Sequence, residues 1–390
     1  MHRLYLDHNA TTPPSAAVVD RMSAVLSQEF GNPSSVHYFG QRAKGVIDQA
    51  RSEVAALLGA DPSEIVFTGG GTEGDNIAIR GVAEALEPTG RKHLVASSIE
   101  HEAVLNTLKA FARRGWRTTL VPVDQSGIVA PDALRTAMAE DTALVSIMHA
   151  NNEIGTIQPI AELATIAREG RAVFHTDAVQ SAGKVPIDVK ALGVDLLSIS
   201  AHKFYGPKGV GALWTRRGLR LQPALTGGKQ ERGRRAGTEN VAGIVGMGVA
   251  AREAMARMTT EGVRIGALRD RLETSILAHV AGTALNGARE PRVPNTTNIS
   301  FDRTEAESLL IALDLEGIAV STGSACSSGT LEPSHVLKAM GLPVHRTQNS
   351  IRFSLGAANT DEDIDRVVAM LPAIVEKLRS LTRTPVARRL

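Results

Sequence analysis

Strand-like and helix-like segments alternate from about residue 64 to residue 214, and this alternation constrains the fold more than any other feature of the sequence. Short β-branched runs such as EIVFT and HLVAS are each followed by a helical pattern, for example IAIRGVAEAL. Such alternation predicts an α/β fold whose central sheet is mostly parallel. Ligands of such sheets bind at the carboxyl ends of the strands, so we expect functional residues just after each strand.

A second, smaller unit is predicted beyond this region. Residues 252–279 have the pattern of a long helix with a polar face, and the chain after them mixes strand and helix patterns on an α+β plan. A chain of 390 residues, 43% of them hydrophobic, can bury more than one core. We expect a large domain at residues 15–255 and a small domain formed by residues 1–14 and 256–390.

Charge and hydropathy argue against two classes of partner. Lys plus Arg number 43 against 41 Asp plus Glu, so the net charge of +2 gives no chain-wide attraction to nucleic acid or to an anionic membrane. The longest apolar run, VAGIVGMGVAA at 241–251, is shorter than the ~20 residues that span a bilayer. The first residues, MHRLYLDHNATT, lack the apolar core of a signal peptide. We therefore expect a cytoplasmic protein.

The first strand of the alternating region runs into GGGTEGDN, residues 69–76, at the start of a helix. Free backbone N–H groups and the positive end of a helix dipole form an anion site there, to which Thr72 adds a hydroxyl. The stretch also matches G-x-G-x-x-G, so a nicotinamide enzyme is an alternative. That alternative predicts an acidic residue at the end of the next strand, where HLVASS has serine. A tight turn without a ligand is the third interpretation.

Two later strands end on side chains that suit one cofactor. RAVFHT runs into DAVQSAG, which places Asp177 at a strand end and Gln180 one turn further on, although Asp177 could also be a helix N-cap. DLLSIS is followed by AHKFYGPKGVG, where Lys203 stands near Ser200 and His202. A lysine in a cleft can form a Schiff base and an aspartate can keep a pyridinium nitrogen protonated. These two groups are what pyridoxal phosphate requires.

Three further residues could belong to the same site, and two of them also have a simpler interpretation. His101 opens a helix in SSIEHEAV, where its ring can stack on a cofactor and move protons or can simply face water. Asn152 follows the strand ALVSIMHA and can donate to a ring oxygen. Arg352, in the strand-like run SIRFSLG, can grip a carboxylate with two parallel hydrogen bonds or face water at a strand edge.

As a set, these motifs resemble those of the cysteine desulfurases, which are fold type I pyridoxal phosphate enzymes of the class V aminotransferase group. The resemblance covers nearly the whole chain, and its segments include YLDHNATTP, FGNPSSVHYFG, FTGGGTEGDN, NNEIGTIQPI, HTDAVQSAGK, SISAHKFYGPKGVG, RAGTEN, SACSSGTLEPSH and NSIRFSLG. It implies an aspartate-aminotransferase-like fold with a large cofactor-binding domain and a smaller α+β domain. It also implies a homodimer whose active sites lie near the subunit boundary.

The resemblance further implies a role for each residue around the cofactor ring. Lys203 carries the aldimine, Asp177 pairs with the ring nitrogen, Gln180 meets the ring hydroxyl, and His101 stacks on the ring and takes part in catalysis. The roles of His8, Asn9 and Gly70 stay open.

For the other parts of cofactor and substrate, the resemblance implies that Arg352 and Asn152 orient the carboxylate of L-cysteine. The residues expected to hold the phosphate are Gly71, Thr72, Ser200 and His202, with Thr238 reaching in from the neighbouring subunit. Thr238 lies in the arginine-rich segment GGKQERGRRAGTEN, residues 227–240, which on its residues alone could also be a nucleic-acid patch or a solvated loop. The near-zero net charge argues against the nucleic-acid interpretation.

Cys326, the single cysteine of the chain, lies in STGSACSSGTLEPSH. One cysteine cannot form an intramolecular disulfide or supply a zinc cluster by itself, and we expect no metal site. Free cysteine is usually a small buried hydrophobe, but neighbouring serine and glycine favour a solvated loop with an accessible thiol. The resemblance implies that Cys326 is the nucleophile, placed in the longer loop of group I enzymes at 321–333. It accepts sulfur from L-cysteine as a persulfide and passes it to an acceptor such as an iron–sulfur scaffold protein.

Other functions remain open on the sequence alone. Selenocysteine lyase or another pyridoxal phosphate enzyme of this fold would use Cys326 differently, and a nicotinamide oxidoreductase or a non-catalytic sulfur carrier would need no cofactor lysine. Nor does the sequence distinguish iron–sulfur assembly, nitrogenase maturation and transfer RNA thiolation as the destination of the sulfur.

Overall fold

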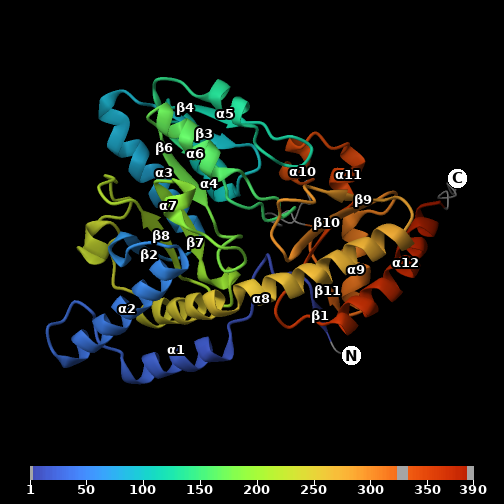
Figure 1. Ribbon diagram of the computed structural model, residues 1–390, viewed down its shortest axis with the longest axis horizontal. Helices are drawn as coiled ribbons and strands as arrows, with labels where there is room; N and C mark the ends of the chain where they lie inside the picture. The colour runs from blue at the N-terminus through green and yellow to red at the C-terminus, as the bar shows by residue number, and fades with distance from the viewer. Residues whose placement is uncertain (1–2, 323–332, 384–390) are drawn as a thin grey trace, which may run out of the picture.

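The computed structural model describes residues 3–322 and 333–383, and a seven-stranded sheet forms the centre of its larger part (Figure 1). In order across the sheet, the strands are β2 (Ile65–Thr68), β8 (Gly211–Thr215), β7 (Leu196–Ser200), β6 (Val173–Asp177), β5 (Thr142–Ser146), β3 (His93–Ser97) and β4 (Arg117–Val121). All neighbours from β7 to β4 pair in parallel, whereas β8 is antiparallel to both β2 and β7. The predicted, mostly parallel sheet is therefore confirmed.

Helices bury both faces of this sheet, so most of its strands are buried along their whole length, whereas the edge strand β4 is partly exposed. Side chains alternate between the faces, so that Leu94 joins one hydrophobic cluster and Val95 the other. The cluster around Leu94 includes residues of α3 (Gly71–Leu86) and α4 (Glu102–Ala112). The cluster around Val95 includes residues of α2 (Tyr38–Leu57), α5 (Pro131–Ala137), α6 (Ile160–Glu169) and α8 (Val241–His279).

The smaller part of the chain has its own hydrophobic cluster, built on two small sheets. The three-stranded antiparallel sheet has the order β12 (Ser350–Ser354), β10 (Thr296–Phe301) and β9 (Thr283–Asn286). The parallel pair is β1 (Leu4–Tyr5) with β11 (Ile318–Ala319).

The remaining α-helices of the whole fold are α1 (Ala16–Gln28), α7 (Val189–Leu192), α9 (Ala306–Leu315), α10 (His335–Ala339), α11 (Val344–Gln348) and α12 (Asp361–Arg383).

Helix α8 joins the two parts and runs between them in Figure 1. It begins at Val241 and not at residue 252, because the apolar run 241–251 forms its buried first turns. Ala254 is its last residue in the cluster of the large sheet, and Ile265 is its first in the cluster of the smaller part. Across the described ranges, no helix is both long and apolar enough to cross a membrane.

Candidate active site

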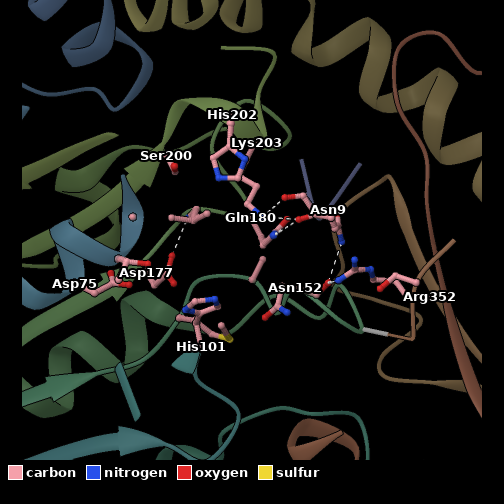
Figure 2. Close-up of a pocket in the computed structure, with 17 residues that line it drawn as sticks. Asn9, Asp75, His101, Asn152, Asp177, Gln180, Ser200, His202, Lys203 and Arg352 are labelled. Atoms are coloured by element: carbon pink, nitrogen blue, oxygen red, sulfur yellow. Dashed lines mark hydrogen bonds between the residues drawn. The ribbon is translucent and has the colours of Figure 1, made fainter. Parts of the chain in front are cut away.

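A cavity of about 360 Å³ lies at the carboxyl ends of the parallel strands, as expected for such a sheet (Figure 2). The predicted site residues that line it are Gly71, Thr72, His101, Asn152, Asp177, Gln180, Ser200, His202, Lys203 and Arg352. Cys326 lies outside the described residues. Thr238 is exposed and does not line the cavity of its own chain. The structure thus brings together side chains from both parts of the fold.

Lys203 lies directly after β7, at the end of the short 3-10 helix η3 (Ala201–Lys203). Its Nζ donates to the backbone oxygens of Asn9, at 2.6 Å, and of Ala10, at 2.9 Å. Burial and, to a lesser degree, the charge of Arg352 lower the pKa of Lys203 to about 8, although Asp177 and Asp7 oppose the shift. A larger fraction of this amine is neutral near pH 7 than of an ordinary lysine, which makes it a better nucleophile.

We predict that acylation of Lys203 in cofactor-free protein reaches half its maximal rate near pH 8, because only the neutral amine reacts and its fraction rises as pH passes the pKa. Peptide mass spectrometry after pulses of an acetylating reagent would measure the rate, with the exposed Lys190 as internal comparison. A midpoint for Lys203 at the ordinary lysine value of 10.5 would contradict the assigned environment.

Asp177 ends β6, and its buried carboxylate accepts a hydrogen bond from the backbone N–H of Val179 at 2.8 Å. The helix N-cap interpretation is wrong, because β6 is followed by turns and the next helix, α7, is capped by Asp188. Burial raises the pKa of Asp177, whereas the nearby His101 and Lys203 lower it. A cationic group in the cavity would therefore find a buried carboxylate partner.

A network of buried, hydrogen-bonded polar side chains lies next to Asp177. His175 is held between the hydroxyls of Ser146 and Ser198, each 2.9 Å from a ring nitrogen, and burial lowers its pKa to about 3. The Asp75 carboxylate lies 3.5 Å from His175 Nε2, and burial together with Asp177 raises its pKa well above the usual value. Asp75 was not predicted as a site residue, although it lies within the glycine-turn motif.

The glycine turn forms the cradle expected for an anion. Gly70 is the N-cap of α3 and offers no side-chain oxygen to the first-turn N–H groups, so these groups can bind a ligand. A Cβ atom on Gly71 would lie 2.6 Å from Val179 Cγ2, so this close approach requires glycine. Ser200 and His202 line the same surface. Burial lowers the pKa of His202 to about 4, which keeps the ring neutral until an anion binds.

His101 is the N-cap of α4, and its Nδ1 accepts a hydrogen bond from the backbone N–H of Ala103 at 3.1 Å. The proton of a neutral imidazole is then on Nε2, because Nδ1 serves as the acceptor. His101 lines the cavity close to Asp177 in Figure 2. The side chain is thus both a helix cap and an exposed residue of the cavity wall.

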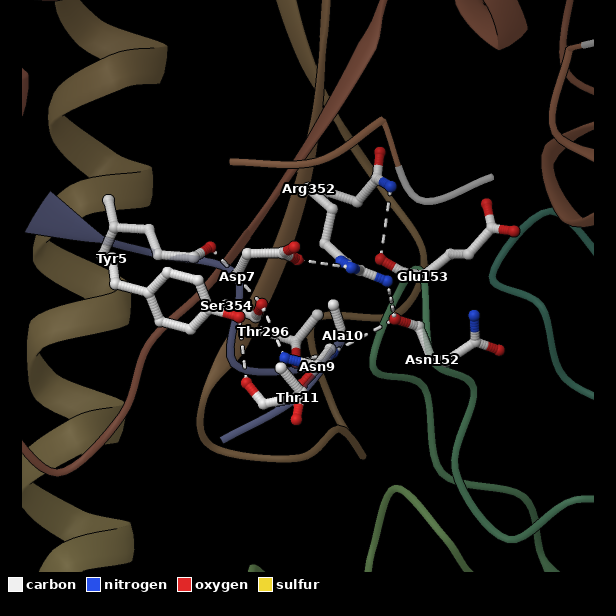
Figure 3. Close-up of polar contacts among 12 residues, drawn as sticks. Tyr5, Asp7, Asn9, Ala10, Thr11, Asn152, Glu153, Thr296, Arg352 and Ser354 are labelled. Carbon is white, nitrogen blue, oxygen red and sulfur yellow. Dashed lines mark hydrogen bonds and ion pairs between the residues drawn. The ribbon is translucent and has the colours of Figure 1, made fainter. Parts of the chain in front are cut away.

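Arg352 lies in β12 and is 4% exposed, so the interpretation as a water-facing edge residue is wrong. One Nη donates to Asp7 Oδ1 at 2.6 Å and the other to the backbone oxygen of Asn152 at 3.0 Å (Figure 3). The buried Nε has no partner within the described residues. Asn152 lies in a turn beyond the end of β5 at Ser146, and not at the strand end itself. The guanidinium is therefore pre-oriented at the side of the cavity.

The N-terminal segment contributes residues that sequence reasoning missed. Asp7 orients Arg352, and the backbone oxygen of Asn9 accepts hydrogen bonds from Lys203 Nζ and from Gln180 Nε2 at 3.0 Å. The segment YLDHNATTP carries part of the family resemblance, so a signal was present, but these contacts span up to 345 positions.

The chain before residue 323 reaches this cavity, and the chain after residue 332 is held by contacts with Glu100 and Glu153. Ser321 lines the cavity on one side. On the other side, Ser334 Oγ donates to the buried Glu153 Oε2 at 2.5 Å, and His335 Nε2 lies 2.9 Å from the backbone oxygen of Glu100. Burial raises the pKa of Glu153, consistent with a carboxyl group held away from water.

The arginine-rich segment is not a free basic patch. Arg51 makes a buried two-point ion pair with Glu231, at 2.7 and 2.8 Å, and Glu231 also accepts from the N–H of Phe67. Arg235 pairs with Glu73 at 2.8 Å. Glu231 and Arg232 have φ of 45° and 58°, a left-handed conformation that these contacts stabilise. The nucleic-acid interpretation is not supported by this arrangement.

This fold and site are those of a class of pyridoxal phosphate enzymes, and the chain belongs to the aminotransferase class-V family, whose model matches residues 4–367. Proteins named cysteine desulfurase IscS from Dictyoglomus turgidum and from Methanosarcina thermophila are each 52% identical over 379 residues. These alignments cover 97% of this chain and 96% and 93% of the two relatives. The predicted resemblance to cysteine desulfurases is confirmed.

Solved structures agree with this assignment. A NifS-like protein matches with a TM-score of 0.89 at 38% identity, covering 98% of this chain and 99% of its own. The structure described as SspA in complex with cysteine matches with a TM-score of 0.79 at 36% identity, covering 90% of this chain and 98% of its own. The predicted fold type is confirmed as well.

Proposed function

We propose that this protein is a pyridoxal-phosphate-dependent cysteine desulfurase, which converts L-cysteine to L-alanine and keeps the sulfur as a persulfide on Cys326. The observation that carries the proposal is that one cavity contains Lys203, Asp177 and Arg352, in a chain 52% identical to cysteine desulfurases. A nicotinamide enzyme would not require this combination of a lysine, an aspartate and an arginine. The complex of the similar SspA structure with cysteine supports L-cysteine as the substrate.

The residues of the cavity fit pyridoxal phosphate. Lys203 would hold its aldehyde carbon, Asp177 would pair with its ring nitrogen and Gln180 with its ring oxygen, since each side chain lines the cavity. The residues suited to its phosphate are Gly71, Thr72, Ser200 and His202 of the same chain, with Thr238 of a second subunit. When bound, the cofactor supplies an electron sink that makes the α-proton of an amino acid acidic.

The side chains of the cavity can perform the remaining steps. Arg352, already oriented by Asp7, binds the substrate carboxylate with Asn152, and the Lys203 amine removes the α-proton. His101 presents Nε2, from which a proton can be exchanged with the substrate thiol.

Cys326 is proposed as the sulfur acceptor. Its thiolate attacks the substrate sulfur, so that an S–S bond forms as the C–S bond breaks. The electron pair of the broken bond stays on the carbon fragment, which takes up one proton at its β-carbon, regains one at its α-carbon and leaves as L-alanine. Cys326 is five positions after Ser321, a residue of the cavity wall, and five residues extend at most about 18 Å. The peptide chain therefore keeps the thiol of Cys326 close enough to Ser321 to reach the cavity.

We also propose that the enzyme is a cytoplasmic homodimer that passes its sulfur to an acceptor protein, such as an iron–sulfur scaffold. A single free thiol suits a reducing compartment. Several large apolar side chains near the start of α2 are exposed, which supports burial by a second subunit. They are Phe30 at 68%, Val36 at 92%, Tyr38 at 65% and Phe39 at 49% exposed. Sedimentation of the purified protein tests the dimer.

The test of the activity is incubation of purified, cofactor-loaded protein with L-cysteine, followed by measurement of L-alanine and of protein-bound persulfide. Equal amounts of both after one turnover support the proposal. Selenocysteine as the only productive substrate would instead assign a selenocysteine lyase, and a colourless protein that binds NAD would exclude the pyridoxal phosphate hypothesis.

We predict that Asp177→Asn lowers turnover by about 10²–10³-fold, the range for losing one electrostatic partner in an active site, because the ring nitrogen loses its anionic partner. The amide can keep the hydrogen bond from Val179, so folding should survive. NMR would follow exchange of the substrate α-proton for deuterium. The control is Asp195→Asn, since Asp195 also accepts a backbone N–H, from Phe174, but at the opposite edge of the sheet. Unchanged exchange in Asp177→Asn would show that the aspartate only closes a turn.

A further inference from the structure

A second lysine lies beside the cavity and has no role in the proposed reaction. Lys184 follows Gln180 by one turn, and its Nζ donates to Gln180 Oε1 and to Asn9 Oδ1, each at 2.9 Å. Burial lowers the pKa of Lys184 well below the usual value, and the nearby charges of Lys203 and Arg352 lower it further. Both acceptors are side-chain amides, whose two ends have opposite hydrogen-bonding character.

The surroundings of Gln180 allow only one orientation of its amide. On one side lies Lys184, which donates through its N–H groups, and on the other lies the backbone oxygen of Asn9, which can only accept. The reversed amide would place two oxygens against each other at Asn9. Gln180 must therefore turn its oxygen to Lys184 and its NH₂ to Asn9, at 3.0 Å. The second N–H of this group is left for the cavity that Gln180 lines.

Lys184 orients the Asn9 amide by the same rule. Asn9 Oδ1 accepts from Lys184 and from Asn295 Nδ2 at 3.0 Å, so its NH₂ faces the other way. That NH₂ donates to Thr296 Oγ1 at 2.8 Å and to the backbone oxygen of Asn152 at 3.1 Å. The Asn9 segment, whose backbone oxygen holds Lys203, is thereby tied to both parts of the fold.

We infer that Lys184 is a positioning residue, which fixes the Gln180 amide so that an N–H donor, and not a carbonyl oxygen, faces the ring oxygen of the cofactor. The inference rests on the proposed function for the place of that ring. The donor stabilises an ionised ring oxygen by a charge-assisted hydrogen bond, whereas a carbonyl oxygen at the same place would repel it. Lys184 thus acts on the cofactor through Gln180.

The test is a pH titration of the visible absorption band of bound pyridoxal phosphate, without any amino acid present. In Lys184→Met the Gln180 amide keeps its hydrogen bond to the Asn9 backbone oxygen but loses the one that holds its own oxygen. The ring oxygen then loses a firmly placed donor and retains a shared proton more strongly. We expect the midpoint of the band to rise by about one pH unit, the effect of losing one charge-assisted hydrogen bond. Lys184→Arg, which still only donates, should shift it less, and the exposed Lys190→Met should leave it unchanged.

A double variant separates positioning from simple structural support. Gln180→Glu keeps an acceptor for Lys184 but removes the donor to the ring, so it should raise the midpoint by itself. Adding Lys184→Met to it should change the midpoint no further, because the lysine acts through the amide. Additive shifts, or an unchanged midpoint in Lys184→Met with only a lowered melting temperature, would overturn the inference. If Lys184→Met does not fold, Lys184→Gln tests the same point, because an amide can offer Gln180 either a donor or an acceptor.

This titration involves no turnover. A wild-type protein that forms no alanine would therefore overturn the proposed desulfurase activity while the midpoints still decide the role of Lys184.

Discussion

Replacement of Lys203 with alanine is expected to lower alanine formation from L-cysteine by about 10⁴-fold or more, the scale of losing a group that reacts covalently and transfers a proton. The fold should persist, because the hydrogen bonds of Lys203 Nζ within the described residues go to two backbone oxygens at the cavity, and no other side chain depends on them. Steady-state alanine assays, thermal unfolding and the visible spectrum of the variant would be measured together.

The matched control is Lys44→Ala, which removes an exposed lysine of α2. It should retain activity and the yellow colour of the loaded protein. Wild-type turnover in Lys203→Ala would show that another amine holds the cofactor. Loss of activity accompanied by loss of the folded state would instead show that Lys203 is structural.

Replacement of Cys326 with serine is expected to remove protein-bound persulfide completely and to lower alanine formation from L-cysteine by about 10²-fold or more. A hydroxyl of similar size is not ionised near neutral pH and cannot hold a transferable sulfur atom, whereas a thiolate can do both. Serine already flanks this position in the sequence, so we expect little change in the free energy of unfolding. Alanine is measured by chromatography and persulfide by an alkylation assay.

Selenocysteine provides the internal control for this variant. The C–Se bond is weaker than the C–S bond, so selenium can leave as elemental selenium, with the bonding electron pair staying on the carbon, without attack by a protein thiol. Cys326→Ser should therefore still release alanine from selenocysteine. Normal alanine formation from L-cysteine would instead make Cys326 an ordinary residue of its segment, and the proposed sulfur transfer would be wrong.

Much of the large sheet could be predicted, because its strands are short runs rich in β-branched residues that alternate with helical patterns. The residues at the strand ends followed from the same pattern, since parallel strands place their carboxyl ends at one edge. Asp177, Lys203 and His101 were therefore predicted together. The short strands β1 and β9 were missed, because two to four residues carry too little periodicity to stand out.

The α/β plan, the family and the gathering of Lys203 and Asp177 at the strand ends could thus be predicted from the order of the residues. The partners that complete the site become visible only in the folded chain. These partners are joined by hydrogen bonds, most of them between residues far apart in the chain. Arg352 donates to Asp7, Lys203 donates to Asn9, and Lys184 donates to Gln180 and Asn9. Such contacts leave no local pattern, because a single polar side chain has the same appearance in a sequence whether it faces water or a buried partner. Their geometry arises only when the N-terminal segment is packed between the two hydrophobic clusters.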